Sequence, residues 1–191
     1  MDPTALITLT ALAALGALAV THDLLFRRIP NSLVLVGMAL GLFFQSYSHP
    51  GAGLFSLSGG GLGLDGALLG ALTGLALFLP LYALRAMGAG DVKLLAMLGV
   101  WLGPTSVAWT ALWTLLAGGV LALVVALWSG VLRQVCMNVY VMLSTSVLHG
   151  HGRHRLAFEA PTETTGQLPY AVAIACGLAA ELMRLRLLVG T

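Results

Sequence analysis

Long apolar runs, interrupted by short polar or glycine-rich stretches, constrain this chain more than any other feature. A helix needs roughly 20 predominantly apolar residues to cross the hydrocarbon core of a membrane. Runs of about that length or somewhat shorter lie at residues 4–25, 32–47, 64–86, 91–102, 105–129 and 168–188. In lipid the backbone polar groups must be satisfied within the segment itself, which a helix achieves. The pattern predicts an all-α, polytopic membrane protein with about six transmembrane helices.

The scarcity of charged residues supports the same fold class. Of the 191 residues, 8% are charged and 59% are hydrophobic, whereas about 25% are charged in ordinary soluble proteins. Because so few charges cannot solvate a globule of this size, the lipid bilayer is the expected solvent. The net charge of +2 and the lack of a basic stripe argue against nucleic-acid binding. We expect one transmembrane domain over residues 1–191, with a polar cytoplasmic loop at residues 130–167.

Glycine, proline and asparagine mark where the helices are expected to begin and end. Residues 49–63 are rich in Gly and Ser, which is typical of an external loop. Gly103 and Pro104 are expected to end the fourth apolar segment. Asn31, which follows Pro30, is expected to cap the second segment.

The basic residues indicate the direction in which the chain crosses the membrane, because Lys and Arg concentrate on the cytoplasmic side. No Lys or Arg precedes Arg27, so the first apolar run lacks the basic start of a signal peptide and is expected to be retained. With the N-terminus outside, Arg184 and Arg186 fall on the outer side. Asp23 and Asp91 then lie at the cytoplasmic face. The other seven basic residues are cytoplasmic: Arg27, Arg28, Arg85, Lys93, Arg133, Arg153 and Arg155.

Acidic side chains inside apolar helices are costly to bury and are therefore candidates for function. Of the seven acidic residues, four fall at the ends of segments or in loops, where solvation explains them: Asp2, Asp65, Glu159 and Glu163. Asp23, Asp91 and Glu181 remain. A simpler explanation exists for Asp23, which could pair with Arg27 at i+4. Asp91 equally suits the N-cap of the fourth segment, after a glycine break. Neither explanation accounts for two acids at the same face of the membrane.

Two neighbouring carboxyl groups are suited to peptide hydrolysis, because both cannot ionise comfortably and one keeps a proton. The ionised group takes a proton from an attacking water, and the protonated group donates to the carbonyl oxygen. Gly88 and Gly90 precede Asp91 and can adopt positive φ, which would let a substrate strand approach the backbone. Broken backbone at membrane depth is tolerable where protein or water satisfies its polar groups, as in a hydrolase cavity.

The same residues carry a resemblance to a known family. The sequence GAGDVK at residues 88–93 matches the motif Gly-x-Gly-Asp-x-Lys. Asp23, followed seven residues later by Pro30 and then Asn31, matches a second motif. Residues 167–177, which open with Gln-Leu-Pro-Tyr, are similar to the last span of that family. With three motifs in this order, the chain resembles the prepilin peptidases, the type IV leader peptidase family of membrane aspartyl proteases.

This resemblance implies a Gly-x-Gly-Asp (GxGD) aspartyl protease fold that uses Asp23 and Asp91 as catalytic aspartates, with the acid and the base unassigned. It also implies the substrates, which are prepilin or pseudopilin precursors, and the cleavage of their short basic leader. The expected location is the cytoplasmic face of the bacterial inner membrane. Snorkelling of the Lys93 ammonium to the interface explains that residue as well as a role in catalysis does. The other motif residues, expected near the substrate, are Gly88, Gly90, Pro30 and Asn31.

Larger members of the family carry an N-terminal cytoplasmic region and also methylate the new pilin N-terminus. Here the first apolar run leads directly to Asp23, so the chain resembles the small, peptidase-only type associated with Tad/Flp pilus systems. The alternative function is an ion-coupled membrane transporter with Asp91 at a broken helix. Such transporters usually have paired halves, and no internal repeat is visible in the sequence.

Neither the histidines nor the cysteines indicate a metal site. His149, His151 and His154 cluster in the polar loop, where a solvated loop explains them better than a metal does. Cys136 and Cys176 stand apart without a Cys-x-x-Cys pair, which excludes a zinc ribbon but leaves a disulfide open. We expect no metal and no other cofactor.

Overall fold

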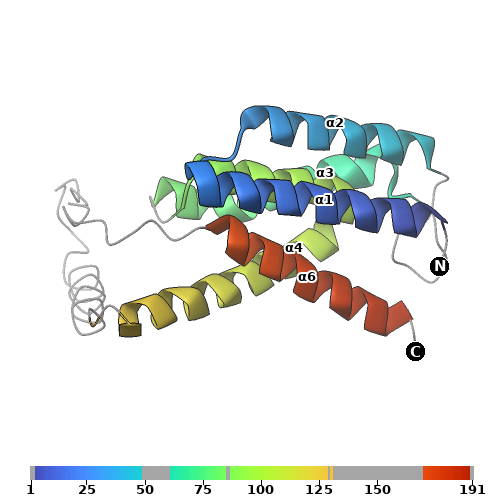
Figure 1. Ribbon diagram of the computed structural model, residues 1–191. Helices are drawn as coiled ribbons and strands as arrows, with labels where there is room; N and C mark the ends of the chain where they lie inside the picture. The colour runs from blue at the N-terminus through green and yellow to red at the C-terminus, as the bar shows by residue number, and fades with distance from the viewer. Residues whose placement is uncertain (1–2, 49–60, 85–86, 129, 131–169, 190–191) are drawn as a thin grey trace, which may run out of the picture. The chain divides into compact units, whose positions relative to one another are not determined.

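A computed structural model describes residues 3–48, 61–84, 87–128, 130 and 170–189 (Figure 1). The regular elements in these ranges are all α-helices, which confirms the predicted all-α class. Most of the expected external loop at residues 49–63 and nearly all of the polar loop at residues 130–167 lie outside the described residues. The helices are α1 (Pro3–Phe26), α2 (Asn31–Tyr47), α3 (Gly63–Ala83), α4 (Ala89–Trp128) and α6 (Tyr170–Val189).

The chain divides into two compact units, which we describe separately. Unit 1 comprises Met1–Gly118 and Pro169–Thr191, and unit 2 comprises Gly119–Leu168. The described part of unit 2 is mainly the last turns of α4, where Val120, Leu123 and Trp128 are exposed. The site and all the packing discussed below belong to unit 1.

Three of the described helices are long and apolar enough to cross a membrane: Ile7–Phe26 in α1, Gly63–Ala83 in α3 and Ala89–Trp128 in α4. The helix Asn31–Tyr47 is apolar but shorter. Large aliphatic side chains such as Leu25 and Leu72 are exposed on these helices, as expected for surfaces that face lipid. The membrane class is therefore supported, while the count of six spans stays a prediction.

The long helix α4 is broken at Gly103, as the sequence predicted. Gly103 has φ 80° and ψ 175°, a conformation that only glycine adopts without strain. Pro104 follows at the first position of the next helix, where its missing N–H is not needed. Residues 89–102 therefore form a first part of α4 and residues 104–128 a second part. The fourth and fifth predicted segments correspond to these two parts.

The first part of α4 is the buried centre of unit 1, with side chains from Leu94 to Leu102 enclosed by the other helices. Glycines allow the neighbouring backbones to approach it closely. A Cβ atom on Gly70 of α3 would overlap the carbonyl oxygen of Gly99, and one on Gly74 would lie 2.6 Å from the Leu95 oxygen. Small residues are the usual means of close helix packing in membranes, where dispersion contacts replace the hydrophobic effect.

Gln45 of α2 satisfies the backbone near the break in α4. Its buried side-chain Nε2 donates to the carbonyl oxygens of Val100 and Trp101, each at 3.4 Å. Its Oε1 accepts the N–H of Leu62, at 3.0 Å, from the residue before α3. The Gln45 side chain thus donates hydrogen bonds to carbonyls that lose their helical partners at Gly103. Through these bonds and the bond from Leu62, it connects α2 to α4 and to the start of α3.

The close approach of α3 and α4 predicts opposite effects for one substitution at two glycines of α4. Gly99→Ala places a methyl group against the Gly70 carbonyl and should lower the free energy of unfolding by about 1–3 kcal/mol. Gly118→Ala meets only ordinary van der Waals contact, with its Cβ 3.6 Å from that of Ala173, and should raise it by about 0.5–1 kcal/mol, since alanine is the better helix former. Thermal unfolding in detergent measures both. Shifts of the same sign would contradict the packing described here.

Candidate active site

The site lies at the end of unit 1 where α1 ends and where α2, α4 and α6 begin; we call this the site end (Figure 1). The turn between α1 and α2 carries the first motif. Arg27, the first residue after α1, has the left-handed conformation, with φ 53°, and its N–H donates to the Asp23 carbonyl at 2.9 Å. Pro30 then occupies the N-cap position of α2 with extended backbone, and its carbonyl accepts the N–H groups of Leu33 and Val34.

The expected capping role of Asn31 is wrong. Asn31 is the first residue of α2, and Pro30, at the N-cap position, makes no side-chain hydrogen bond there. The Asn31 side chain instead accepts a hydrogen bond from Lys93 Nζ, at 3.0 Å. Both residues are exposed, and the bond joins the first motif to the second. Because Pro30 and not Asn31 occupies the N-cap position, the amide of Asn31 is available for this contact.

Asp91 is held inside the first turn of α4 rather than at its N-cap. Helix α4 begins at Ala89, so Asp91 is its third residue. Its Oδ2 accepts the N–H of Gly88 at 3.1 Å, and its own N–H donates to the Gly88 carbonyl at 3.2 Å. A carboxylate at this position satisfies one of the free N–H groups that precede a helix, as in half of a capping box. Asp91 is 8% exposed, which makes it a nearly buried acid on the central helix.

The glycines before Asp91 are needed for close contact, and the expected positive φ is wrong for both. Among the described glycines, positive φ occurs at Gly63, Gly103 and Gly130. A Cβ on Gly90 would lie 3.2 Å from the Cβ of Ile29, in the turn between α1 and α2. A Cβ on Gly88 would lie 3.2 Å from Asp91 Oδ2. The glycines therefore let the two motifs meet and leave space beside the carboxylate.

The N-terminus of helix α6 supplies the hydrogen-bond donor for Asp23. The N–H of Ala171, the second residue of α6, donates to Asp23 Oδ2 at 3.2 Å. The first N–H groups of a helix have no partner within it, and their positive dipole end attracts a carboxylate. Pairing of Asp23 with Arg27 would not explain this contact between helices. Because the donor is a backbone group, no side-chain pattern could have revealed it.

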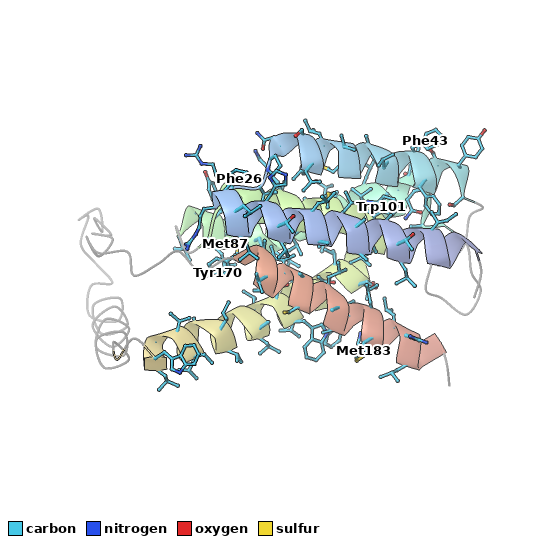
Figure 2. The ribbon with its side chains drawn as sticks, viewed as in Figure 1. Phe26, Phe43, Met87, Trp101, Tyr170 and Met183 are labelled. Atoms are coloured by element: carbon cyan, nitrogen blue, oxygen red, sulfur yellow. The ribbon has the colours of Figure 1, made fainter. Side chains whose placement is uncertain are left out.

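The structure brings the two motifs to one place. Figure 2 shows Phe26, Met87 and Tyr170, which mark the three chain segments around the site, gathered at the site end. The turn after Asp23 and the first turns of α4, which carry Asp91, meet at two contacts, one between Ile29 and Gly90 and one between Asn31 and Lys93.

The described residues contain no cluster of side chains that could form a metal site. Within them, no three His, Cys, Asp or Glu side chains gather closely enough to hold a metal ion. Cys176 is exposed and free on α6. The predicted absence of a metal and of a cofactor stays a prediction, because part of the chain is not described. The histidines of the polar loop, His149, His151 and His154, and also Cys136, lie outside the described residues.

Comparison with known proteins agrees with the motifs. The model of the type IV leader peptidase family matches residues 10–148, which include both Asp23 and Asp91. The chain is also similar to a prepilin leader peptidase/N-methyltransferase of Stutzerimonas stutzeri, with 38% identity over 120 residues. That alignment covers 59% of this chain and 36% of the relative, so the chain spans about a third of the relative's length.

No solved structure gives a significant match to the chain. The family assignment therefore rests on sequence, and the family match extends over most of the 191 residues. It includes the turn that ends at Pro30 and the glycines before Asp91, which the structure places in contact through Ile29 and Gly90. The chain belongs to the type IV leader peptidase family.

Proposed function

We propose that this protein is a membrane aspartyl endopeptidase that removes the short basic leader from type IV prepilins of the Tad/Flp kind. The observation that carries the proposal is the placement of two acids from separate family motifs at the same end of one helical unit. Each carboxylate accepts a backbone N–H: Asp91 accepts that of Gly88 in its own turn, and Asp23 accepts that of Ala171 in α6. Such bonds orient a carboxylate without using a second side chain.

In the proposed reaction, the ionised aspartate removes a proton from a water molecule as the water oxygen bonds to the scissile carbonyl carbon. The protonated aspartate donates its proton to the carbonyl oxygen, which gives a neutral tetrahedral diol. Collapse of the diol breaks the C–N bond. The amine leaves with the proton taken from water, and a diol hydroxyl returns a proton to the second aspartate. Neither a metal nor a cofactor takes part.

The proposed orientation places the site at the cytoplasmic face of the bacterial inner membrane. Arg27 and Arg28, in the turn between α1 and α2, and Lys93, in the first turns of α4, all lie at the site end. Basic residues accumulate on the cytoplasmic side of membrane proteins. A prepilin would then present its leader to the site from the cytoplasm while its hydrophobic helix stays in the bilayer.

Removing the charge of either aspartate should abolish cleavage. We expect Asp23→Asn and Asp91→Asn each to lower the rate of leader removal by at least about 100-fold, because an amide can neither accept the water proton nor supply one. A co-expressed prepilin, followed by the mobility of its processed form, measures the effect. The matched control is Asp65→Asn, because Asp65 is an exposed acid in the first turn of α3. This variant should remove the leader at the normal rate. Near-normal cleavage in either site variant would refute the proposed mechanism.

The bond between Lys93 and Asn31 predicts a coupled effect on the same reaction. Lys93→Met and Asn31→Ala should each slow cleavage by about fivefold, as expected for an exposed charged hydrogen bond that holds two motifs together. The double variant should be no slower than either single variant, because the bond is already lost. Initial cleavage rates of the four purified proteins test this. If the fold-loss in cleavage rate of the double variant equals the product of the two single losses, the two side chains act separately.

A further inference from the structure

A buried ion pair lies on α6, in the half of the helix remote from the aspartates. Glu181 is fully buried, at 0% exposure, and Arg184 is 30% exposed. The pairing is bidentate: Arg184 Nε donates to Glu181 Oε2 at 2.7 Å, and Nη2 donates to Oε1 at 2.6 Å. A buried carboxylate is tolerated only when it is paired in this way, so Arg184 is what permits Glu181 to stay enclosed.

The pair also fastens α6 to the second part of α4. The Arg184 guanidinium lies 5.0 Å from the centre of the Trp109 ring, a cation–π contact between the two helices. One turn before Glu181, Gly177 packs against the α4 backbone. A Cβ there would overlap Thr114 Oγ1 and would lie 2.8 Å from the Thr110 oxygen. The remote half of α6 is thus held against the second part of α4 by the cation–π contact of the paired Arg184 and by the close approach of Gly177; we call this arrangement the seating of α6.

The opposite end of the same helix holds Asp23. Helix α6 is continuous from Tyr170 to Val189, and its residue Ala171 donates the hydrogen bond to Asp23. Ala171 precedes Glu181 by about 15 Å along the axis, at 1.5 Å per residue. If the helix moves as a rigid unit, a shift of the backbone at Glu181 also shifts the Ala171 N–H. The packing of the remote half of α6 is thereby linked to the hydrogen bond that Asp23 accepts.

We propose that Glu181, Arg184 and Trp109 are positioning residues for catalysis, which act by seating α6 so that Ala171 orients the Asp23 carboxylate. This inference rests on the proposed function. None of the three residues belongs to the motifs that identify the family. Glu181 and Arg184 also lie beyond residues 10–148, which the family model matches.

The test compares the removal of one charge with the removal of both. Arg184→Met leaves Glu181 buried and unpaired, which should unseat α6 and lower kcat for leader cleavage by about 10- to 100-fold with little change in KM. The double variant Glu181→Gln/Arg184→Met leaves no charge to solvate and should recover most of the lost kcat. Rates are expressed per folded protein, measured as the monodisperse fraction in detergent.

Two controls separate positioning from general loss of stability. Arg186→Met removes an exposed charge from the same helix without uncovering Glu181 and should cleave normally. Ala67→Gly removes a fully buried methyl group from α3, three residues before Gly70, whose backbone lies against Gly99, and lowers the unfolding temperature. Per folded molecule, it should keep a normal kcat. An equal loss of kcat in Ala67→Gly would overturn the inference.

Amide hydrogen exchange reports the Ala171–Asp23 bond directly. With carbonyl-labelled tyrosine and ¹⁵N-alanine, only Ala83 and Ala171 follow a tyrosine and give a filtered NMR signal. The Ala171 N–H is in the first turn of α6, so its protection comes from Asp23 and not from the helix. Arg184→Met should speed exchange at Ala171 by about tenfold or more and leave Ala83 unchanged.

The outcomes distinguish this inference from the proposed function. If the wild-type protein does not cleave a prepilin, the proposed function fails. If the wild type cleaves while Arg184→Met keeps its kcat, or keeps the wild-type exchange rate at Ala171, the positioning role is wrong. A loss of kcat with faster exchange at Ala171, restored in the double variant, supports it.

Discussion

The close packing of the first part of α4 against α2 and α3 is the constraint on which the rest of the structure depends. Residues 94–102 are enclosed because Gly70 and Gly74 of α3 bring its backbone into contact with that of α4. This buried helix carries Asp91 in its first turn, so the acid inherits a fixed position. At the other end of the same segment, the Gln45 side chain donates hydrogen bonds to the carbonyls beside the break at Gly103.

The two acids depend on different parts of the chain. Asp91 is fixed locally, by the Gly88 N–H in its own turn, whereas Asp23 is fixed by Ala171, which is 148 residues distant in sequence. In the proposed mechanism, the site is complete only when α6 is held in this position. The proposed role of Glu181 and Arg184, which lie outside the family motifs, follows from this division.

The sequence predicted the helices and the break in α4 well, because both depend on residues that are adjacent in the chain. Apolar runs in lipid must be helical, and Gly103 followed by Pro104 has no good helical alternative. The contacts of the motif residues were harder to predict. Asn31 bonds to Lys93 instead of capping α2, and Gly90 faces Ile29 instead of taking positive φ. Each of these depends on which segments meet in space, and a single sequence does not carry that information.

The central claim is that Asp23 and Asp91 form a working pair, and their proximity in the membrane is the most direct test. The measurement uses the variant Asp23→Cys/Asp91→Cys, with Cys136 and Cys176 replaced by alanine, and a short bifunctional methanethiosulfonate reagent. The account predicts an intramolecular cross-link in native membranes, detected by mass spectrometry of the peptides that carry positions 23 and 91. Modification of each cysteine separately, without any link between them, would contradict it.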